Sequence, residues 1–299
     1  MKNKAIIGGF IALAVIVLIA VLCWQVGKKI TDSFRKTDES DVNKTIELPV
    51  QPTTPEQAAK IYLAFGNPSN ADASNPNNYL MVNNFYALSY NRDKAIPNWV
   101  AWRISPAELG NFPRPNPDPF RPDDRLPKGW KRVTPTDYRN SDFDKGHLCP
   151  SADRSASVEG MSATFLMTNM TPQTGDLNRG PWQKLEAYLR TLVTRGSDVY
   201  IIAGVYGESG KLKNKVVIPA NDWKVALIVP SGAGLSAVNE NTRVIAVDMP
   251  NVKGIKNADW QIYRTSVRDI EQKTGLNLFS NLPQNVQDAT ETKVDNNSN

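Results

Sequence analysis

Residues 144–150 read DKGHLCP and contain His147, the only histidine in the 299-residue chain. Gly146 directly before it and Pro150 three residues after it indicate a backbone held in an irregular conformation. A single histidine is more often structural than catalytic. Nevertheless, any mechanism of this chain that needs an imidazole must use His147, because no other residue supplies one.

Two further segments lie C-terminal to this stretch: residues 169–173 read NMTPQ, and residues 178–186 read NRGPWQKLE. The second segment leads into a predicted helix over Pro181–Val193, because proline suits the first helical position. If Asn178 and Glu186 lay on one helix, they would be about 12 Å apart along its axis and rotated by about 80°. Both side chains could not then hold one metal ion directly.

Apolar runs elsewhere predict more strands than helices. A second helix is expected over Ser266–Lys273, where Ser266 caps the first turn and Gly275 ends the helix. Because the strands do not alternate regularly with the helices, we predict an α+β fold with a central antiparallel or mixed sheet and flanking helices. The predicted strands are Trp99–Ile104, Thr164–Met170, Val199–Val205, Lys224–Val229 and Val244–Val247.

The N-terminal region contains an uncharged apolar segment over residues 5–26, AIIGGFIALAVIVLIAVLCWQV. As a helix it would be about 33 Å long, enough to cross the hydrocarbon core of a bilayer. We therefore interpret residues 1–30 as one N-terminal transmembrane helix, an anchor or uncleaved signal. A cleaved signal peptide is the alternative, although no A-x-A-like cleavage site is obvious.

The rest of the chain divides by composition into three parts. Residues 31–58 are polar and carry prolines near their end, which predicts a linker. Residues 283–299 are also polar, and we expect a disordered tail there. Residues 59–282 then form one domain without internal repeats.

The overall charge and the cysteine content exclude few classes of protein. The net charge of +5 and the isoelectric point near 9.1 fit a polyanionic partner, but many ordinary proteins share them. Cys23 lies in the apolar segment and Cys149 lies beside His147, so no disulfide framework can be inferred. We expect Cys149 and Trp182 to be core residues.

The segment D-K-G-H-L-x-P resembles the D-R-G-H signature of the DNA/RNA non-specific endonucleases, a family with a ββα-metal (His-Me finger) active site. The resemblance continues through N-x-x-P-Q and N-x-x-x-W-x-x-L-E, which end at Glu186. It also covers YALSYNRDKAIPNWVAWRI upstream and, downstream, VIPANDWKVALIV and DWQIYRTSVRDIEQKTGLNLF. Together these motifs span about residues 86–279, nearly the whole predicted domain.

The resemblance implies roles for individual residues. His147 is the expected general base, since a neutral imidazole can take a proton from water. Asn178 is the expected ligand of one Mg²⁺, for which Mn²⁺ can substitute, and waters fill most other positions of the ion. Glu186 is expected to orient a water of that ion; without the resemblance it would be taken for a solvated helix carboxylate.

Three residues are expected to support the site. Asn169 and Gln173 match supporting positions of the family, and their alternative role is capping or turn hydrogen bonds. Asp144 either fixes the loop around His147 or acts on the site indirectly.

The resemblance also implies an arginine that stabilises charge on the phosphate. Arg114 and Arg121 are the two candidates, and Arg114 fits the order of the family's motif better. The arginine of D-R-G-H is replaced here by Lys145, which keeps the charge but loses the planar two-pronged contact. We therefore expect Lys145 to act at the site, with an altered rate or substrate preference.

The sequence thus predicts a metal-dependent endonuclease that cuts DNA and RNA and leaves 5′-phosphate and 3′-hydroxyl ends. The alternative is a membrane-tethered nucleic-acid-binding protein with a decayed site, and a third possibility is a structural envelope protein. Family members form dimers, so a homodimer is an open expectation, and any inhibitor protein is unknown.

The predicted location follows from the predicted activity. Lysines and arginines are similar in number at both ends of residues 5–26, so charge does not decide the orientation. A general nuclease in the cytoplasm would endanger its own cell. We therefore expect a membrane-anchored protein with an extracytoplasmic catalytic domain, with secretion after signal cleavage as the alternative.

Overall fold

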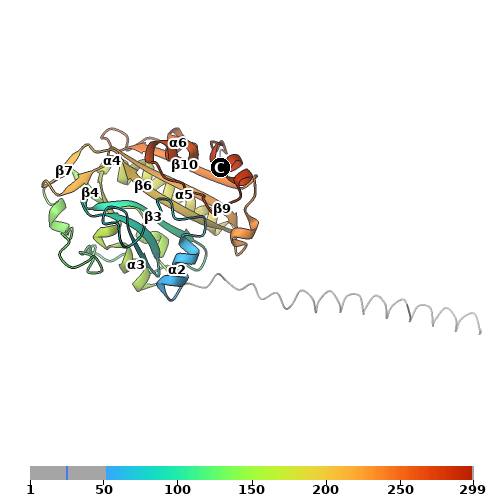
Figure 1. Cartoon of the computed structure of the whole chain (residues 1–299), viewed down its shortest axis with the longest axis horizontal. Coiled ribbons are helices and arrows are strands. Elements are labelled where there is room, and N and C mark those ends of the chain that lie inside the picture. The colour runs from blue at the N-terminus through green and yellow to red at the C-terminus, as the bar shows by residue number, and fades with distance from the viewer. Residues whose placement is uncertain (1–24, 26–51, 298–299) are drawn as a thin grey trace, which may run out of the picture. The chain divides into compact units, whose positions relative to one another are not determined.

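The computed structural model describes Gln25 and residues 52–297. Its centre is an antiparallel sheet of seven strands in the order β1-β2-β3-β6-β9-β10-β11. Figure 1 labels β3, β6, β9 and β10 of this sheet. The strands are β1 (Tyr79–Asn83), β2 (Tyr86–Asn91), β3 (Ile96–Ile104), β6 (Ser197–Tyr206), β9 (Asn221–Pro230), β10 (Arg243–Pro250) and β11 (Arg264–Thr265).

The middle strands of this sheet are buried on both faces. In β3, Val100 and Trp102 belong to one core cluster, whereas Trp99 and Ala101 belong to another. Alternate side chains of a strand point to opposite faces, so two hydrophobic cores lie on either side of the sheet. This is why β3, β6 and β9 read as nearly continuous apolar runs.

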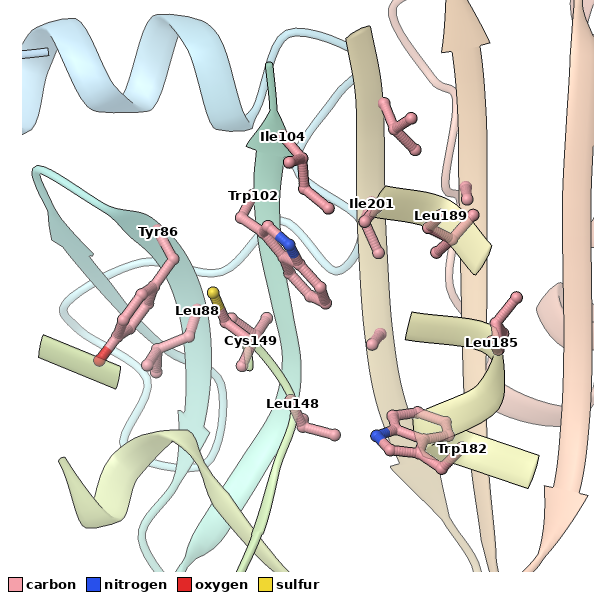
Figure 2. Packing of buried hydrophobic residues seen from close by; sticks show 14 of the residues in the cluster. Tyr86, Leu88, Trp102, Ile104, Leu148, Cys149, Trp182, Leu185, Leu189 and Ile201 are labelled. Carbon is pink, nitrogen blue, oxygen red and sulfur yellow. The ribbon is translucent and has the colours of Figure 1, made fainter. Parts of the chain in front are cut away.

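Helices cover the two cores. Helix α5 (Gln183–Thr194) contributes Leu185 and Leu189 to the cluster that contains Trp102, as Figure 2 shows. Helices α6 (Val267–Thr274) and α7 (Gln284–Glu291) contribute to the cluster on the other face. The mixed α+β architecture with an antiparallel central sheet is therefore confirmed.

A separate hairpin carries the histidine. Strand β4 (Phe143–His147) pairs antiparallel with β5 (Met170–Thr174), so that His147 lies opposite Met170. A π-helical turn, η4 (Asn178–Trp182), then leads into α5. Two strands followed by a helix form the expected ββα unit.

Short elements complete the fold. Strands β7 (Gly210–Leu212) and β8 (Val216–Ile218) form a second small hairpin. The helices are α2 (Pro55–Tyr62), α3 (Val158–Thr164) and α4 (Gly175–Leu177), and the 3-10 turns are η1 (Pro135–Tyr138), η2 (Ser151–Arg154), η3 (Met167–Asn169), η5 (Gly234–Ala237) and η6 (Trp260–Tyr263).

Most of the predicted elements are confirmed. Four of the five predicted strands lie within β3, β6, β9 and β10, and both predicted helices form. Ser266 caps α6 through its side chain, and Gly275 ends it in the left-handed conformation with φ of 72°. The predicted strand over Thr164–Met170 is wrong: α3 ends at Thr164, η3 covers the middle, and only Met170 begins a strand.

Two predicted boundaries need correction. Helix α2 begins at Pro55 inside the predicted linker 31–58, with Thr54 accepting a hydrogen bond from the Gln57 amide. The tail 283–299 is not disordered where it is described, since α7 lies within it. The few apolar side chains of this segment are enough to hold it on the domain, because Val286 packs into the core and Asp295 pairs with Arg243 at 2.9 Å.

The predicted anchor over residues 5–26 lies, apart from Gln25, outside the described residues. Among Gln25 and residues 52–297, no helix has the length and apolar character needed to span a bilayer.

Candidate active site

Six of the side chains selected from the sequence line one cavity of about 420 Å³. Its walls come from a proline-rich connection, from β4 and the turn after it, and from η4 with the start of α5. The lining residues are Arg114, Asp118, Phe120, Phe143, Asp144, Lys145, His147, Pro150, Ser151, Asn178, Arg179, Gln183 and Glu186.

His147 ends β4 and is held between two aromatic rings. The centres of the Phe120 and Phe165 rings lie 5.4 and 5.2 Å from the imidazole centre. Its Nε2 atom is buried and has no hydrogen-bond partner among the described residues. Burial, followed by the positive charge of Arg114, lowers the pKa of His147 from 6.5 to about 3. The imidazole is therefore neutral at physiological pH and can accept a proton.

The chain on both sides of His147 is fixed to the core. Leu148 and Cys149 are fully buried and lie among the core residues in Figure 2. The Asn169 side chain accepts a hydrogen bond from the Cys149 amide at 3.0 Å and donates to the Cys149 carbonyl at 2.8 Å. Trp182 Nε1 donates to the His147 carbonyl at 3.3 Å. These bonds fix where His147 lies relative to the ββα unit.

The Gln173 side chain explains why the residue directly before His147 is a glycine, Gly146. A Cβ atom on Gly146 would lie 2.1 Å from Gln173 Oε1, so the buried amide occupies the space that a side chain would need. Gln173 Nε2 in turn donates to Asp222 Oδ1 at 2.9 Å. Gln173 and Asn169 thus lie behind the cavity and shape its backbone; neither lines it.

Asn178 and Asp144 meet in the cavity wall. Asn178 Nδ2 donates to Asp144 Oδ2 at 2.9 Å, and Arg179 Nη1 contacts Asp144 Oδ1 at 3.0 Å. The bond from Nδ2 fixes the orientation of the Asn178 amide and leaves its Oδ1 atom available to coordinate a cation. Asp144 therefore orients the Asn178 amide. Its two expected roles, fixing the loop around His147 or acting on the site indirectly, stay predictions.

Asn178 and Glu186 lie on different segments of a broken helix. Gly180 has φ of −116° and ψ of −120°, which interrupts the helical path between them. A Cβ on Gly180 would lie 2.6 Å from the Lys256 carbonyl oxygen, so this close backbone approach requires glycine. The spacing of one regular helix does not apply, and both residues line the same cavity.

Glu186 is a largely buried carboxylate of α5. Its side chain is 11% exposed, and its Oε1 atom lies 3.3 Å from Lys224 Nζ. Burial raises the pKa of Glu186, whereas the positive charge of Lys224 opposes this rise. Glu186 is therefore not the solvated helix carboxylate of the alternative interpretation.

The structure distinguishes the two candidate arginines. Arg114 lines the cavity, and its guanidinium carbon lies 5.3 Å from the centre of the Phe165 ring. Arg121 is absent from this cavity wall and donates from Nη1 to the Ser162 carbonyl at 2.8 Å. Of the two, only Arg114 faces the cavity.

Asp118 is a cavity residue that the sequence interpretation missed. It accepts hydrogen bonds from Nε and Nη2 of Arg114 at 2.7 and 2.6 Å. The sequence feature that could have pointed to Asp118 is its position four residues after Arg114 in a rigid, proline-rich segment. Ser151, also missed, lies 3.3 Å from Arg114 Nη1 and helps to orient the guanidinium.

Lys145 of β4 also belongs to the wall of this cavity. Its Nζ atom lies 4.8 Å from the centre of the Phe120 ring. Lys145 and Arg114 therefore place two positive charges beside His147.

The donors in the cavity fit a hydrated divalent ion. No group of three or more His, Cys, Asp or Glu side chains within residues 52–297 could form a protein cage for a metal. The cavity instead offers the Asn178 amide oxygen and the Glu186 carboxylate. Mg²⁺ dehydrates reluctantly and is commonly bound by one or two protein oxygens, so this sparse set suits it.

Comparisons with known proteins identify the family of the chain. The sequence model of the DNA/RNA non-specific endonuclease family matches residues 66–285. A nuclease from Nostoc sp. is 48% identical over 257 residues, which cover 83% of this chain and 93% of that protein. A nuclease from Serratia marcescens is 33% identical over 231 residues, which cover 72% of this chain and 80% of that protein.

A solved structure shows the same fold. The crystal structure of the EndoG/EndoGI complex matches with a TM-score of 0.64 and 24% identity, covering 78% of this chain and 95% of that one. At this identity, the likeness concerns the fold alone. The extent of the family match and the identity to the Nostoc nuclease show that this chain belongs to the DNA/RNA non-specific endonuclease family and is an endonuclease that hydrolyses phosphodiester bonds.

Proposed function

We propose that this enzyme uses a divalent cation to cleave both DNA and RNA, leaving 5′-phosphate and 3′-hydroxyl ends. The observation that carries the proposal is the buried, unpaired Nε2 of His147 in a cavity that also holds Arg114, Lys145 and Asn178. A neutral base, two cations and a free amide oxygen are the groups that phosphodiester hydrolysis needs.

His147 is the proposed general base. It takes a proton from a water molecule while the water oxygen bonds to phosphorus and the bond from phosphorus to the 3′ oxygen breaks. The departing 3′ oxygen takes a proton from a solvent water molecule and becomes the 3′-hydroxyl end. In the free enzyme, Arg114 and Lys145 both lower the pKa of His147. A bound phosphate would offset their charges, so substrate binding is expected to raise this pKa toward the working pH, where a general base is most effective.

Asn178 is the proposed metal ligand through Oδ1, and Glu186 orients a water of the ion's shell. When bound, the ion supplies positive charge beside the phosphate and the departing oxygen. Mg²⁺ is the proposed ion, and Mn²⁺ can replace it, because oxygen donors and waters suit both.

Arg114 and Lys145 are the proposed phosphate contacts. Asp118 occupies one edge of the Arg114 guanidinium and Ser151 lies near Nη1, which together direct the remaining donors toward the cavity. Contacts to phosphate carry no sequence information and do not require a particular sugar. This supports cleavage of DNA and RNA with weak sequence preference.

We also propose that residues 5–26 anchor the enzyme to a membrane with the catalytic domain outside the cytoplasm. The uncharged run of 22 residues supports the anchor. The orientation rests on the danger that a general nuclease in the cytoplasm would pose to its own cell. In the EndoG/EndoGI complex, EndoG is inhibited. By analogy with that complex, we propose that a protein inhibitor can also bind the present chain. A homodimer stays an expectation from the family resemblance.

The test uses the full-length protein in mild detergent with supercoiled plasmid or RNA, in Mg²⁺, Mn²⁺ or EDTA. We expect metal-dependent cleavage of both substrates and a loss of about 10²–10⁴-fold in rate for His147→Ala. Undiminished cleavage by His147→Ala would contradict the role of His147. Salt-dependent binding without cleavage in either metal would favour the tethered binder.

A further inference from the structure

Lys224 is buried at the centre of the large sheet. It lies in β9 opposite Ala203 of β6 and Val247 of β10, and is 1% exposed. Ala226, two residues further on the same strand face, belongs to the core under α5. Lysine is almost never fully buried unless its charge is paired, so this position requires an explanation.

The ammonium group contacts one carboxylate and two indole rings. Lys224 Nζ lies 3.3 Å from Glu186 Oε1. It also lies 4.0 Å from the centre of the Trp182 ring and 5.6 Å from that of Trp102. The indole faces attract the cation, and Glu186 is the one acceptor for Nζ within residues 52–297.

Other charges near Glu186 are already engaged. Arg190 lies in the same helix, but its Nη1 pairs with Asp153 Oδ1 at 2.8 Å. Asp153 also accepts a hydrogen bond from Trp102 Nε1 at 3.0 Å. Lys224 is therefore the cation that directly contacts Glu186.

This contact distinguishes the two carboxylate oxygens of Glu186, because only one of them has a protein partner within residues 52–297. Oε1 contacts Lys224, which belongs to β9, an interior strand of the sheet. Oε2 accepts no hydrogen bond from residues 52–297, and Glu186 lines the cavity. The oxygen that remains for water is thus fixed by the sheet rather than by α5 alone.

We propose that Lys224 is a positioning residue, which holds Glu186 through Oε1 so that the other oxygen orients water in the ion's shell. The inference rests on the proposed function, because it assigns Lys224 to the same site. A residue supporting a metal site in this way commonly contributes about 10–100-fold to affinity or activity.

The experiment compares Lys224→Met, Lys224→Arg, Glu186→Gln and the double variant Lys224→Met/Glu186→Gln in the full-length protein. We expect Lys224→Met to lower kcat/KM by about 10–100-fold and to weaken Mn²⁺ binding, measured calorimetrically without substrate. Lys224→Arg should retain most of both. In the Glu186→Gln background, removing the Lys224 charge should cost no further activity or Mn²⁺ affinity.

The matched control is Lys60→Met, which removes an exposed lysine of α2. An equal loss from Lys224→Met in both backgrounds, or activity and Mn²⁺ affinity equal to those of Lys60→Met, would overturn the inference. If Lys224→Met does not fold, the test is the comparison of Glu186→Gln with the double variant, which should have equal activity and Mn²⁺ affinity. The double variant is expected to fold, because removing both charges of a buried pair is tolerated better than removing one. Wild-type protein without metal-dependent cleavage would instead refute the proposed function.

Discussion

His147 is surrounded by groups that decide its protonation. Phe120 and Phe165 exclude water from the ring, while Lys145 and Arg114 add positive charge. The negative charge of Asp118 raises the pKa of His147, but this carboxylate also accepts hydrogen bonds from Arg114. At the scale of single residues, burial and charge both favour the neutral base.

The titration of His147 can be followed directly, because it is the only histidine. Its folded pKa of about 3 lies below the ordinary value of 6.5, so its ring proton signals should show no protonation between pH 8 and pH 5. Lys145→Met should raise the pKa, because Lys145 lowers it in the wild type. The measurement is an NMR titration, and a wild-type midpoint near 6.5 would contradict the prediction.

Arg114 and Arg121 form a matched pair of substitutions. Arg114→Ala should lower kcat by about 10²–10³-fold, because it removes a charge aimed at the phosphate. Arg121→Ala should change kcat little, since Arg121 bonds to the Ser162 carbonyl away from the cavity. Plasmid and RNA cleavage rates measure both, and a larger loss for Arg121→Ala would reverse the assignment.

Among the elements, η4 decides the geometry of the site. The turn contains Pro181 and the non-helical Gly180, and it places Asn178 and Glu186 around one cavity. Regular helical spacing would have kept them about 12 Å apart along the axis. The residue types were readable from the sequence, whereas the break was not, because it depends on contact between Gly180 and the distant Lys256 backbone.

Gly180→Ala tests this element. The added Cβ would meet the Lys256 Cα at 2.8 Å, and backbone cannot move aside cheaply. We expect a loss of about 1–3 kcal/mol in the free energy of unfolding and a marked loss of activity, as Asn178 shifts. Urea unfolding and cleavage assays measure these effects. Thr191→Ala, on the exposed side of α5, is the control, and equal behaviour of the two variants would contradict the prediction.

At the scale of the whole molecule, the C-terminal segment is part of the folded domain. Val286 is 6% exposed and packs with the core beneath α6, whereas Val294 is 40% exposed. Val286→Ala should lower the free energy of unfolding by about 1–2 kcal/mol. Val294→Ala should change it by less than about 0.5 kcal/mol, and equal effects in urea unfolding would contradict this packing.

Asp222 connects the large sheet to the hairpin that carries His147. Burial raises its pKa from 3.8 to about 7, and Gln173 Nε2 donates to it. Between pH 4 and pH 7 the folded chain therefore holds a proton that the unfolded chain lacks, so this group's contribution to stability falls as pH rises and is lost above pH 7.

Asp222→Asn should remove that dependence. Above pH 7 the variant should be more stable than the wild type by several kcal/mol, since each pKa unit corresponds to about 1.4 kcal/mol. Near pH 4 the two proteins should be similar. Urea unfolding at both pH values measures the difference, and a difference that does not change with pH would refute the raised pKa.

Patterns and motifs in the sequence predicted the α+β class, four strands of the central sheet, the helices that became α5 and α6, and six of the residues that line the cavity. Apolar periodicity and the spacing of motifs are local properties that a chain carries without its fold. Apolarity alone did not separate the turn at Thr164–Met170 from a strand, because both bury the same side chains. A polar composition also concealed α7, which is stabilised by contacts with distant residues.

The folded structure was needed to show which arginine faces the cavity, how Asp118 and Ser151 orient it, and which lysine contacts Glu186. Arg114 is 33 residues from His147 along the chain, and Lys224 is 38 residues from Glu186. Contacts of this kind depend on how strands and helices pack together. The sequence therefore supplied the chemical groups, and long-range packing determined which of them act on one another.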